Sequence, residues 1–197
     1  MANRVERRDF CRVMAGLPLL ATTTARSAIT IPGQGAELGQ AAVATATAQF
    51  VAAGEDRTHT PVAMGFSSLG FKVSGQDTRG SLLLMEHVGL AKGGGPPRHL
   101  HYEQDEWFYV MEGEVVAEVG KERFRLKTGD SIFAPRNVPH AFVYVADKPG
   151  RLLIAFTPAG RMEAYFRDGH GFDAETFARY GMKYVGPALT LEDAERV

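Results

Sequence analysis

The sequence is almost free of cysteine: Cys11 is the only one among 197 residues. A scaffold held by disulfides, or a metal site built from several thiolates, is therefore excluded. No apolar run approaches the roughly 20 residues that a membrane-spanning helix needs. The formal net charge of −1 also lacks the basic excess typical of nucleic-acid-binding domains. What is present, 45% hydrophobic residues with 12 Phe, is enough for a globular domain with a full core.

The N-terminus has the composition of an export signal. A basic start precedes an apolar stretch at 13–21 and a small-residue stretch that ends near Ala28, which predicts a signal peptide over residues 1–28. Arg7-Arg8-Asp9-Phe10 resembles the twin-arginine type of signal, although Glu6 and Cys11 depart from its usual flanks. The resemblance implies a periplasmic or secreted protein. An uncleaved basic tail is the alternative, and cleavage near Ala46 or Ala48 is a further option.

Two further regions follow the signal. Residues 29–58 are rich in Gly, Ala and Thr with few charges, and we interpret them as a leader or linker. Residues 59–197 are expected to form one domain. From Thr60 to Thr157, short apolar runs alternate with turn residues about every ten positions, which favours consecutive antiparallel strands closing into a jelly roll or small barrel.

The pattern changes after the last predicted strand. Met162, Tyr165 and Phe166 recur at helical spacing, and Asp173 is a candidate N-cap for a second helix over 174–180, with Gly181 after its end. The predicted fold class is therefore all-β, a jelly-roll barrel with two short C-terminal helices. The aromatic stripe is expected to pack as a lid on the barrel exterior or on a partner, with gating of a substrate as the alternative.

Four residues in two segments form a candidate metal site. His99 and His101 share one face of a short strand, and alternation in the next strand aims Glu106 in the same direction. His140 follows a turn bounded by Pro135 and Pro139. Three imidazoles and one carboxylate suit one divalent transition metal, namely Fe, Mn, Co, Ni, Cu or Zn. In an octahedral site, four protein ligands leave two positions open. His87 lies in another strand and faces either the cavity or a neighbour.

The spacing of these residues resembles the two motifs of the cupin superfamily. Gly93, His99, His101, Glu106 and Gly113 follow the first motif at every position. The second motif is matched by Gly129, Pro135 and His140, with Asn137 where Gly is usual and Tyr144 where Asn is usual. Asn tolerates the left-handed conformation that Gly would adopt, so we expect the turn to survive. The resemblance implies a single-domain cupin with His99, His101, Glu106 and His140 as metal ligands.

The expected function depends on a second, more specific resemblance. The segments 106–114 and 139–142 and the helical tail resemble quercetin dioxygenase-like cupins, which implies a metal-dependent dioxygenase acting on a flavonol or another enolisable small molecule. Glu106 would be both ligand and general base. Inward apolar residues are expected to line the substrate pocket: Phe108, Val110, Phe142, and either Phe133 or Ile132.

Two other functions remain open at this stage. One is an isomerase, cyclase or lyase that uses the same ligands without dioxygen, and the other is a non-catalytic protein that binds a small molecule through its metal. By analogy with other cupins, we also expect a homodimer.

Overall fold

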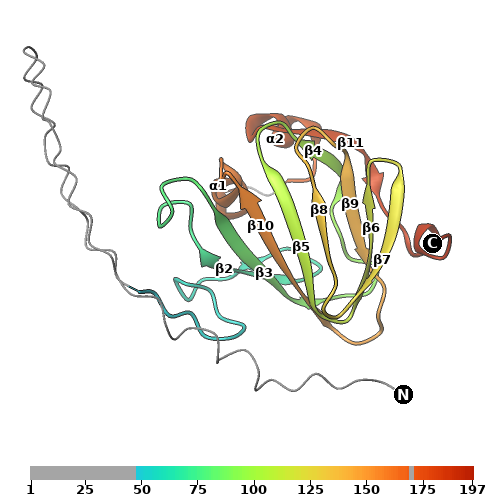
Figure 1. Ribbon diagram of the computed structural model, residues 1–197, viewed down its shortest axis with the longest axis horizontal. Helices are drawn as coiled ribbons and strands as arrows, with labels where there is room; N and C mark the ends of the chain where they lie inside the picture. Colours follow the sequence, from blue (N-terminus) through green and yellow to red (C-terminus); the bar gives the residue numbers. More distant parts are fainter. Residues whose placement is uncertain (1–47, 169–170) are drawn as a thin grey trace, which may run out of the picture. The chain divides into compact units, whose positions relative to one another are not determined.

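Alternating apolar and polar residues build two antiparallel sheets that face each other (Figure 1) in the computed structural model, which describes residues 48–168 and 171–197. The first sheet has the order β1-β2-β3-β10-β5-β8 and comprises Val62–Ala63, Ser68–Val73, Leu83–Leu90, Gly150–Thr157, Asp105–Glu112 and Ser131–Ala134. The second has the order β11-β4-β9-β6-β7 and comprises Met182–Ala188, Pro97–His101, His140–Tyr144, Glu114–Val119 and Glu122–Lys127.

This arrangement is a jelly roll, so the predicted all-β class is confirmed. The strands belong to two separate hydrogen-bonded sheets and do not close into one continuous barrel. Chain segments far apart in sequence are neighbours: β10 lies between β3 and β5 in the first sheet, and β9 lies between β4 and β6 in the second.

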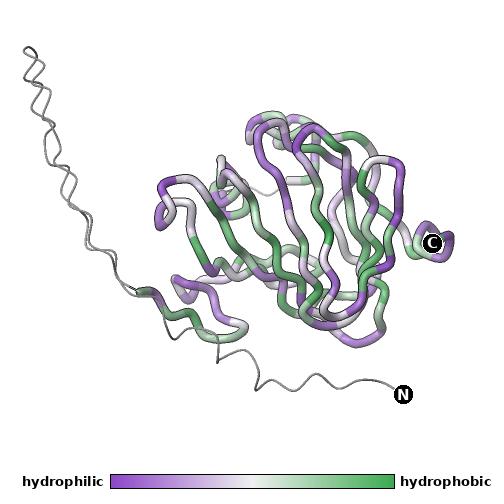
Figure 2. The backbone as a smooth tube through the Cα atoms, viewed as in Figure 1, coloured by the Kyte–Doolittle hydropathy of each residue, from purple (hydrophilic) through white to green (hydrophobic). Residues whose placement is uncertain are grey.

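The core lies between the two sheets. Along β5 burial alternates strictly, so that Glu106, Phe108 and Val110 point inward while Trp107 and Tyr109 point outward, as the sequence predicts. Figure 2 shows apolar residues recurring along the strands of both sheets. Because neighbouring strands are in register, Glu106, Phe108 and Val110 of β5 lie beside Phe156, Ile154 and Leu152 of β10. Apart from Glu106, these residues form a continuous apolar layer.

The two predicted helices are present as α1, Met162–Asp168, and α2, Ala174–Arg179. Asp173 caps α2 by accepting a hydrogen bond from the backbone N of Thr176, which confirms the predicted N-cap. A third helix, α3 at Leu191–Ala194, was not predicted, so the expectation of two helices is wrong for the C-terminus. Thr190 and Asp193 form a capping box there, but four residues are too few to show helical periodicity.

The structure describes only part of the region to which the N-terminal predictions refer. The expected signal peptide, residues 1–28, lies outside the described residues, as does most of the expected linker. Packing on the sheets begins before residue 59, because Asp56 is buried and its carboxylate accepts hydrogen bonds from the backbone N of Phe71 and of Thr58. Within residues 48–168 and 171–197, no helix is long and apolar enough to cross a membrane.

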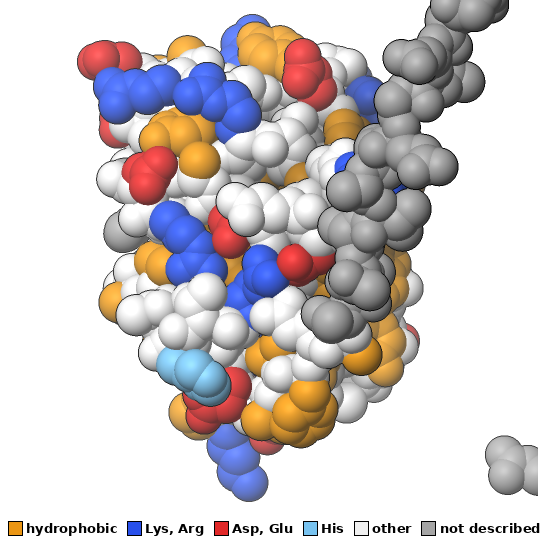
Figure 3. Space-filling view, turned by 90° about the vertical axis from the view of Figure 1, so that its left-hand side faces the viewer, with side chains coloured by type: hydrophobic (Ala, Val, Ile, Leu, Met, Phe, Trp, Pro, Cys, Tyr) orange, Lys and Arg blue, Asp and Glu red, His pale blue; other side chains and the backbone are white. Residues whose placement is uncertain are grey.

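The surface drawn in Figure 3 carries Lys and Arg side chains next to Asp and Glu, with apolar side chains between them. No field of one sign extends across this face. Mixed charge of this kind does not provide the basic footprint that nucleic-acid backbones need.

Candidate metal centre

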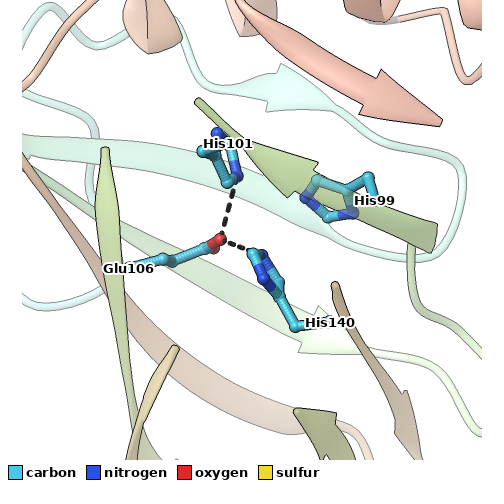
Figure 4. A group of neighbouring side chains, drawn as sticks. All are labelled: His99, His101, Glu106 and His140. Carbon is cyan, nitrogen blue, oxygen red and sulfur yellow. Dashed lines mark hydrogen bonds and ion pairs between the residues drawn. The ribbon is translucent and has the colours of Figure 1, made fainter. Parts of the chain in front are cut away.

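Four chemically reactive side chains converge between the sheets. His99 and His101 come from β4, Glu106 from the start of β5 and His140 from the start of β9, where His140 pairs directly with His99. All four are buried, and one ligand atom from each lies within 4.8 Å of the others. Figure 4 shows the three imidazoles around the Glu106 carboxylate. The structure thus brings together all four residues that the sequence singled out.

Backbone contacts fix the tautomers of two of these histidines. His99 Nδ1 lies 2.8 Å from the Pro97 carbonyl oxygen, and His140 Nδ1 lies 3.0 Å from the Val138 carbonyl oxygen. A carbonyl can only accept, so both Nδ1 atoms carry the proton and donate it. Nε2 is therefore the atom of each ring that is available to bind a metal, an arrangement common around metal-ligating histidines.

Contacts within the cluster leave the ring nitrogens of His101 without hydrogen-bond partners in the described part of the chain. His140 Nε2 lies 2.8 Å from Glu106 Oε2, and His101 Nε2 lies 3.1 Å from the same oxygen. The His101 contact lacks hydrogen-bond alignment, so neither ring nitrogen of His101 has a hydrogen-bond partner among the described residues. Buried nitrogens without partners are costly, and a metal at the centre of the cluster would satisfy the one that faces it.

Electrostatics favour the protonation states that metal binding requires at Glu106 and His99, whereas the Nε2 proton of His140 must leave when a metal binds. Burial alone would raise the pKa of the Glu106 carboxyl, but the adjacent His101 and His140 outweigh burial and lower it. Burial, with the charges of His140 and His101, lowers the pKa of His99 to about 3. Burial also opposes the charged form of His140, yet the bond to Glu106 prevails and raises that pKa. An anionic carboxylate beside a neutral His99 fits a divalent cation.

Two local features hold the ligand-bearing segments in place. Asn137 adopts φ 65°, and its backbone N donates to the His101 carbonyl oxygen over 2.7 Å, so the turn before His140 is tied to β4. This confirms that Asn can replace Gly at this position. Gly95 lets the chain before β4 pass close to β9, since a Cβ at residue 95 would overlap the Phe142 carbonyl oxygen.

The four residues lie beside a partly open cavity with mostly apolar walls. Its free volume is about 30 Å³, room for about two water molecules. His99, His101 and Glu106 line it together with His87 and thirteen other residues from both sheets and from the C-terminal helices. Among these, Met64, Met85, Met162 and Met182 contribute flexible side chains.

The predicted pocket residues have different outcomes. Phe142 lines the cavity. Phe108 lies behind the metal centre, with its ring edge-on to His140 and to Phe142, and Val110 is fully buried in the core without reaching the cavity. The prediction for Phe133 is wrong: this side chain is 52% exposed and lies on the outer face, opposite Trp107. Its alternative, Ile132, points inward and packs on the core.

Several cavity residues were missed in the sequence. Met162, Tyr165 and Phe166 of α1 and Phe177 of α2 are buried and form part of the wall. The helical spacing of Met162, Tyr165 and Phe166 predicts a lid on the barrel exterior or on a partner, with substrate gating as the alternative, and does not place these residues at the cavity. The signal that could have placed them is the length of the chain after β10, which is long enough to fold back over the open end of the sheets.

Parts of the chain are similar to known proteins. Residues 86–156, which contain all four candidate ligands, match the family described as Cupin domain. The chain is 32% identical over 60 residues to the uncharacterized protein MJ1618 of Methanocaldococcus jannaschii, covering 30% of this chain and 48% of that protein. It is 29% identical over 72 residues to the tetracenomycin polyketide synthase protein TcmJ of Streptomyces glaucescens, covering 36% and 48% respectively.

The chain thus spans about half the length of these curated relatives. Among solved structures, an RmlC-like cupin from Shewanella frigidimarina NCIMB 400 is 25% identical, covers 51% of this chain and 84% of that chain, and gives a TM-score of 0.44. Residues 86–156 are thus similar to a cupin domain, and the jelly roll of which they are part contains a site that could hold a metal ion.

Proposed function

We propose that this protein is a metal-dependent cupin enzyme, most specifically a dioxygenase acting on a flavonol-like or other enolisable small molecule. The observation that supports the proposal is the buried cluster of three imidazoles and one carboxylate beside an apolar cavity. His99, His101, Glu106 and His140 would hold the metal through Nε2 atoms and a carboxylate oxygen. The cavity would hold the organic part of the substrate away from water.

The residues of the chain have distinct roles in this proposal. When bound, a divalent transition metal supplies Lewis acidity and open coordination positions. Glu106 accepts the acidic proton of the enol on the carboxylate oxygen that does not hold the metal, and the substrate is left as its enolate. His99 and His140 keep their orientation because their Nδ1 protons are bound to backbone carbonyls. Aromatic walls exclude water during the reaction.

The size of the cavity bears on the choice of substrate. Its free volume of about 30 Å³ is smaller than the 300–1,000 Å³ typical of ligand pockets, so a flavonol requires side chains to rearrange. Methionine side chains in the wall can do so at low cost because they have three rotatable bonds. Smaller β-diketones need less rearrangement, and both classes belong in a substrate screen.

The decisive experiment combines metal analysis with oxygen uptake. Metal content is measured on protein from its native compartment, and the holoprotein is then screened with flavonols and β-diketones in an oxygen electrode. We expect oxygen consumption in step with substrate loss, and Glu106→Gln is expected to abolish turnover. Substrate conversion without oxygen uptake contradicts the dioxygenase proposal. Ligand binding with no product, unchanged in Glu106→Gln, supports a binding protein.

A second candidate is an isomerase, cyclase or lyase that needs no dioxygen. The match to a tetracenomycin polyketide synthase protein favours it, because polyketide chains contain enolisable β-dicarbonyl groups. The same site chemistry serves this reaction: a carboxylate removes an acidic proton and a cation stabilises the enolate. The screen should therefore include β-dicarbonyl substrates under argon, where conversion indicates the non-oxidative reaction.

We further propose export through a twin-arginine signal and assembly as a homodimer. Arg7→Lys combined with Arg8→Lys should keep the protein in the cytoplasm, and unchanged export of this double variant contradicts the proposed signal. Light scattering on the purified protein tests the proposed homodimer. A measured mass equal to that of the monomer, over the working concentration range, contradicts it.

A further inference from the structure

A fourth histidine, His87, lies in the cavity wall away from the candidate metal centre. His87 belongs to β3, is 3% exposed and lines the same cavity as His99, His101 and Glu106. On β10, His87 lies opposite Leu152, whereas Glu106 lies opposite Phe156, four residues further along. At about 3.3 Å per residue, these two levels are about 13 Å apart along the strand. His87 is therefore too far along the sheet to join the four ligands.

One nitrogen of His87 is already bound. His87 Nδ1 lies 2.6 Å from the Ser67 hydroxyl oxygen. The hydroxyl proton of Ser67 has no other acceptor among the described residues, so the arrangement that satisfies it has Ser67 donating to Nδ1. Nε2 then carries the ring proton. No described residue accepts a hydrogen bond from Nε2, and this N–H donor is left for a molecule in the cavity.

The ring is held in one orientation by its neighbours. Phe66 stacks on one side with centroids 5.8 Å apart, and Phe142 lies edge-on at 6.0 Å. Burial lowers the pKa of His87 to about 4, with Glu106 opposing this shift, so the imidazole is neutral at physiological pH. A neutral, oriented N–H in an otherwise apolar wall is suited to recognising an uncharged or delocalised oxygen acceptor.

We propose that His87, oriented by Ser67, is a substrate-recognition subsite that donates a hydrogen bond from Nε2 to an acceptor oxygen of an elongated molecule whose other end chelates the metal. The inference rests on the proposed metal site but not on the use of dioxygen. It specifies the substrate class as a flat, mainly apolar molecule with a chelating pair of oxygens at one end and a further carbonyl-like oxygen at the other.

The test compares two chelating probes under argon. Both 4-nitrocatechol and 4-ethylcatechol chelate a metal through adjacent oxygens, but only the nitro compound has an acceptor at the far end. Calorimetry measures their affinities for Co(II)-loaded wild type, His87→Phe, His87→Gln and Ser67→Ala. Metal content and thermal unfolding are measured on each variant. Because dioxygen is absent, failure of the dioxygenase proposal in the oxygen-uptake assay leaves this test intact.

We expect His87→Phe to bind 4-nitrocatechol about tenfold more weakly, the effect of losing one buried hydrogen bond, and 4-ethylcatechol within about twofold of wild type. His87→Gln should retain part of the preference because its amide also donates, and Ser67→Ala should show an intermediate loss. Equal losses for both probes indicate a merely structural residue and overturn the proposal. It is also overturned if nitrocatechol affinity is unchanged, or if wild type binds neither probe.

Discussion

Arg136 binds the Asp105 carboxylate through three contacts: its backbone N at 2.8 Å, Nε at 3.1 Å and Nη2 at 2.7 Å. Asp105 directly precedes the candidate ligand Glu106, and Arg136 lies in the turn that leads to His140. A single ion pair therefore joins the two sequence segments that build the metal centre. Such two-pronged Arg–carboxylate pairs fix geometry as well as contributing stability.

The first prediction concerns this pair and pH. The hydrogen bonds from Arg136 lower the pKa of Asp105 to about 2, against about 3.9 in an unfolded chain. A lowered pKa stabilises the folded state above about pH 4, and this contribution is lost as the pH falls towards 2. Metal-free Asp105→Asn should therefore unfold at a lower temperature than wild type at pH 7, and the two should converge near pH 2.

The matched control for that experiment is Asp147→Asn. Asp147 pairs with Lys92 over 2.7 Å, but the Asp147 side chain is 90% exposed. Exposed ion pairs contribute little to stability, so this variant should unfold like wild type at pH 7. If the two variants lose stability equally, the Asp105–Arg136 pair has no special role in joining the segments.

The second prediction concerns the ligands themselves. A bound metal should raise the unfolding temperature of wild type, because it binds the folded state alone. His99→Gln and His140→Gln should each weaken metal affinity by on the order of 100-fold and largely remove this stabilisation. His59→Gln is the control, since His59 is 86% exposed and lies outside the cluster. Thermal unfolding with and without a chelator measures the stabilisation by metal, and metal analysis measures the metal content of each variant. Equal metal content in all variants contradicts the assignment of these residues as ligands.

The third prediction concerns Tyr144, which stands where cupins usually have Asn. Its ring fills the space over Gly113 and Gly150, and its hydroxyl donates to the Lys148 carbonyl oxygen over 2.7 Å. A Cβ at residue 150 would overlap the Tyr144 ring, so Gly150→Ala should cost about 1–3 kcal/mol of stability by overpacking. Denaturant titration measures the loss. Gly186→Ala, where the nearest described atom is 3.8 Å from the added Cβ, is the control and should be near neutral.

The fourth prediction concerns the backbone at Asn137. Its φ of 65° is accessible to Gly and Asn but strained for a β-branched residue. Asn137→Gly should keep both stability and metal affinity close to wild type, whereas Asn137→Val should cost about 1–2 kcal/mol and weaken metal binding by shifting the turn before His140. Equal metal affinity in the two variants would show that the turn does not position the ligand.

The sequence was sufficient to predict the four candidate ligands because their grouping has local causes. His99 and His101 share a face through the two-residue period of a strand, and Glu106 resumes that face after a short turn. His140 needed the resemblance to the second cupin motif, since no local pattern links it to residues 34 positions earlier. The inward face of β5 was predictable for the same reason as the histidine pair. Its eight residues alternate between buried and less buried positions, and this alternation decides which side chains face the core.

The error at Phe133 has the opposite cause. β8 has only four residues, Ser131–Ala134, between two turns, so its pattern fits either phase. A shift of one residue exchanges the two faces of a strand. Pairing with β5 decides the phase, because Trp107 lies opposite Phe133 on the outside and Phe108 lies opposite Ile132 on the inside.

By itself, the sequence determined the strand periodicity, the jelly-roll class and the residues that can bind a metal, because each depends on spacing within a few residues. Only the tertiary structure decided what surrounds the metal centre. The wall of the cavity combines residues of β3, β4, β5, β9, β10 and β11 with residues of α1 and α2, and His87 faces it through pairings with β2 and β10. These contacts arise from chain segments brought together by burial of apolar surface, which no local pattern encodes.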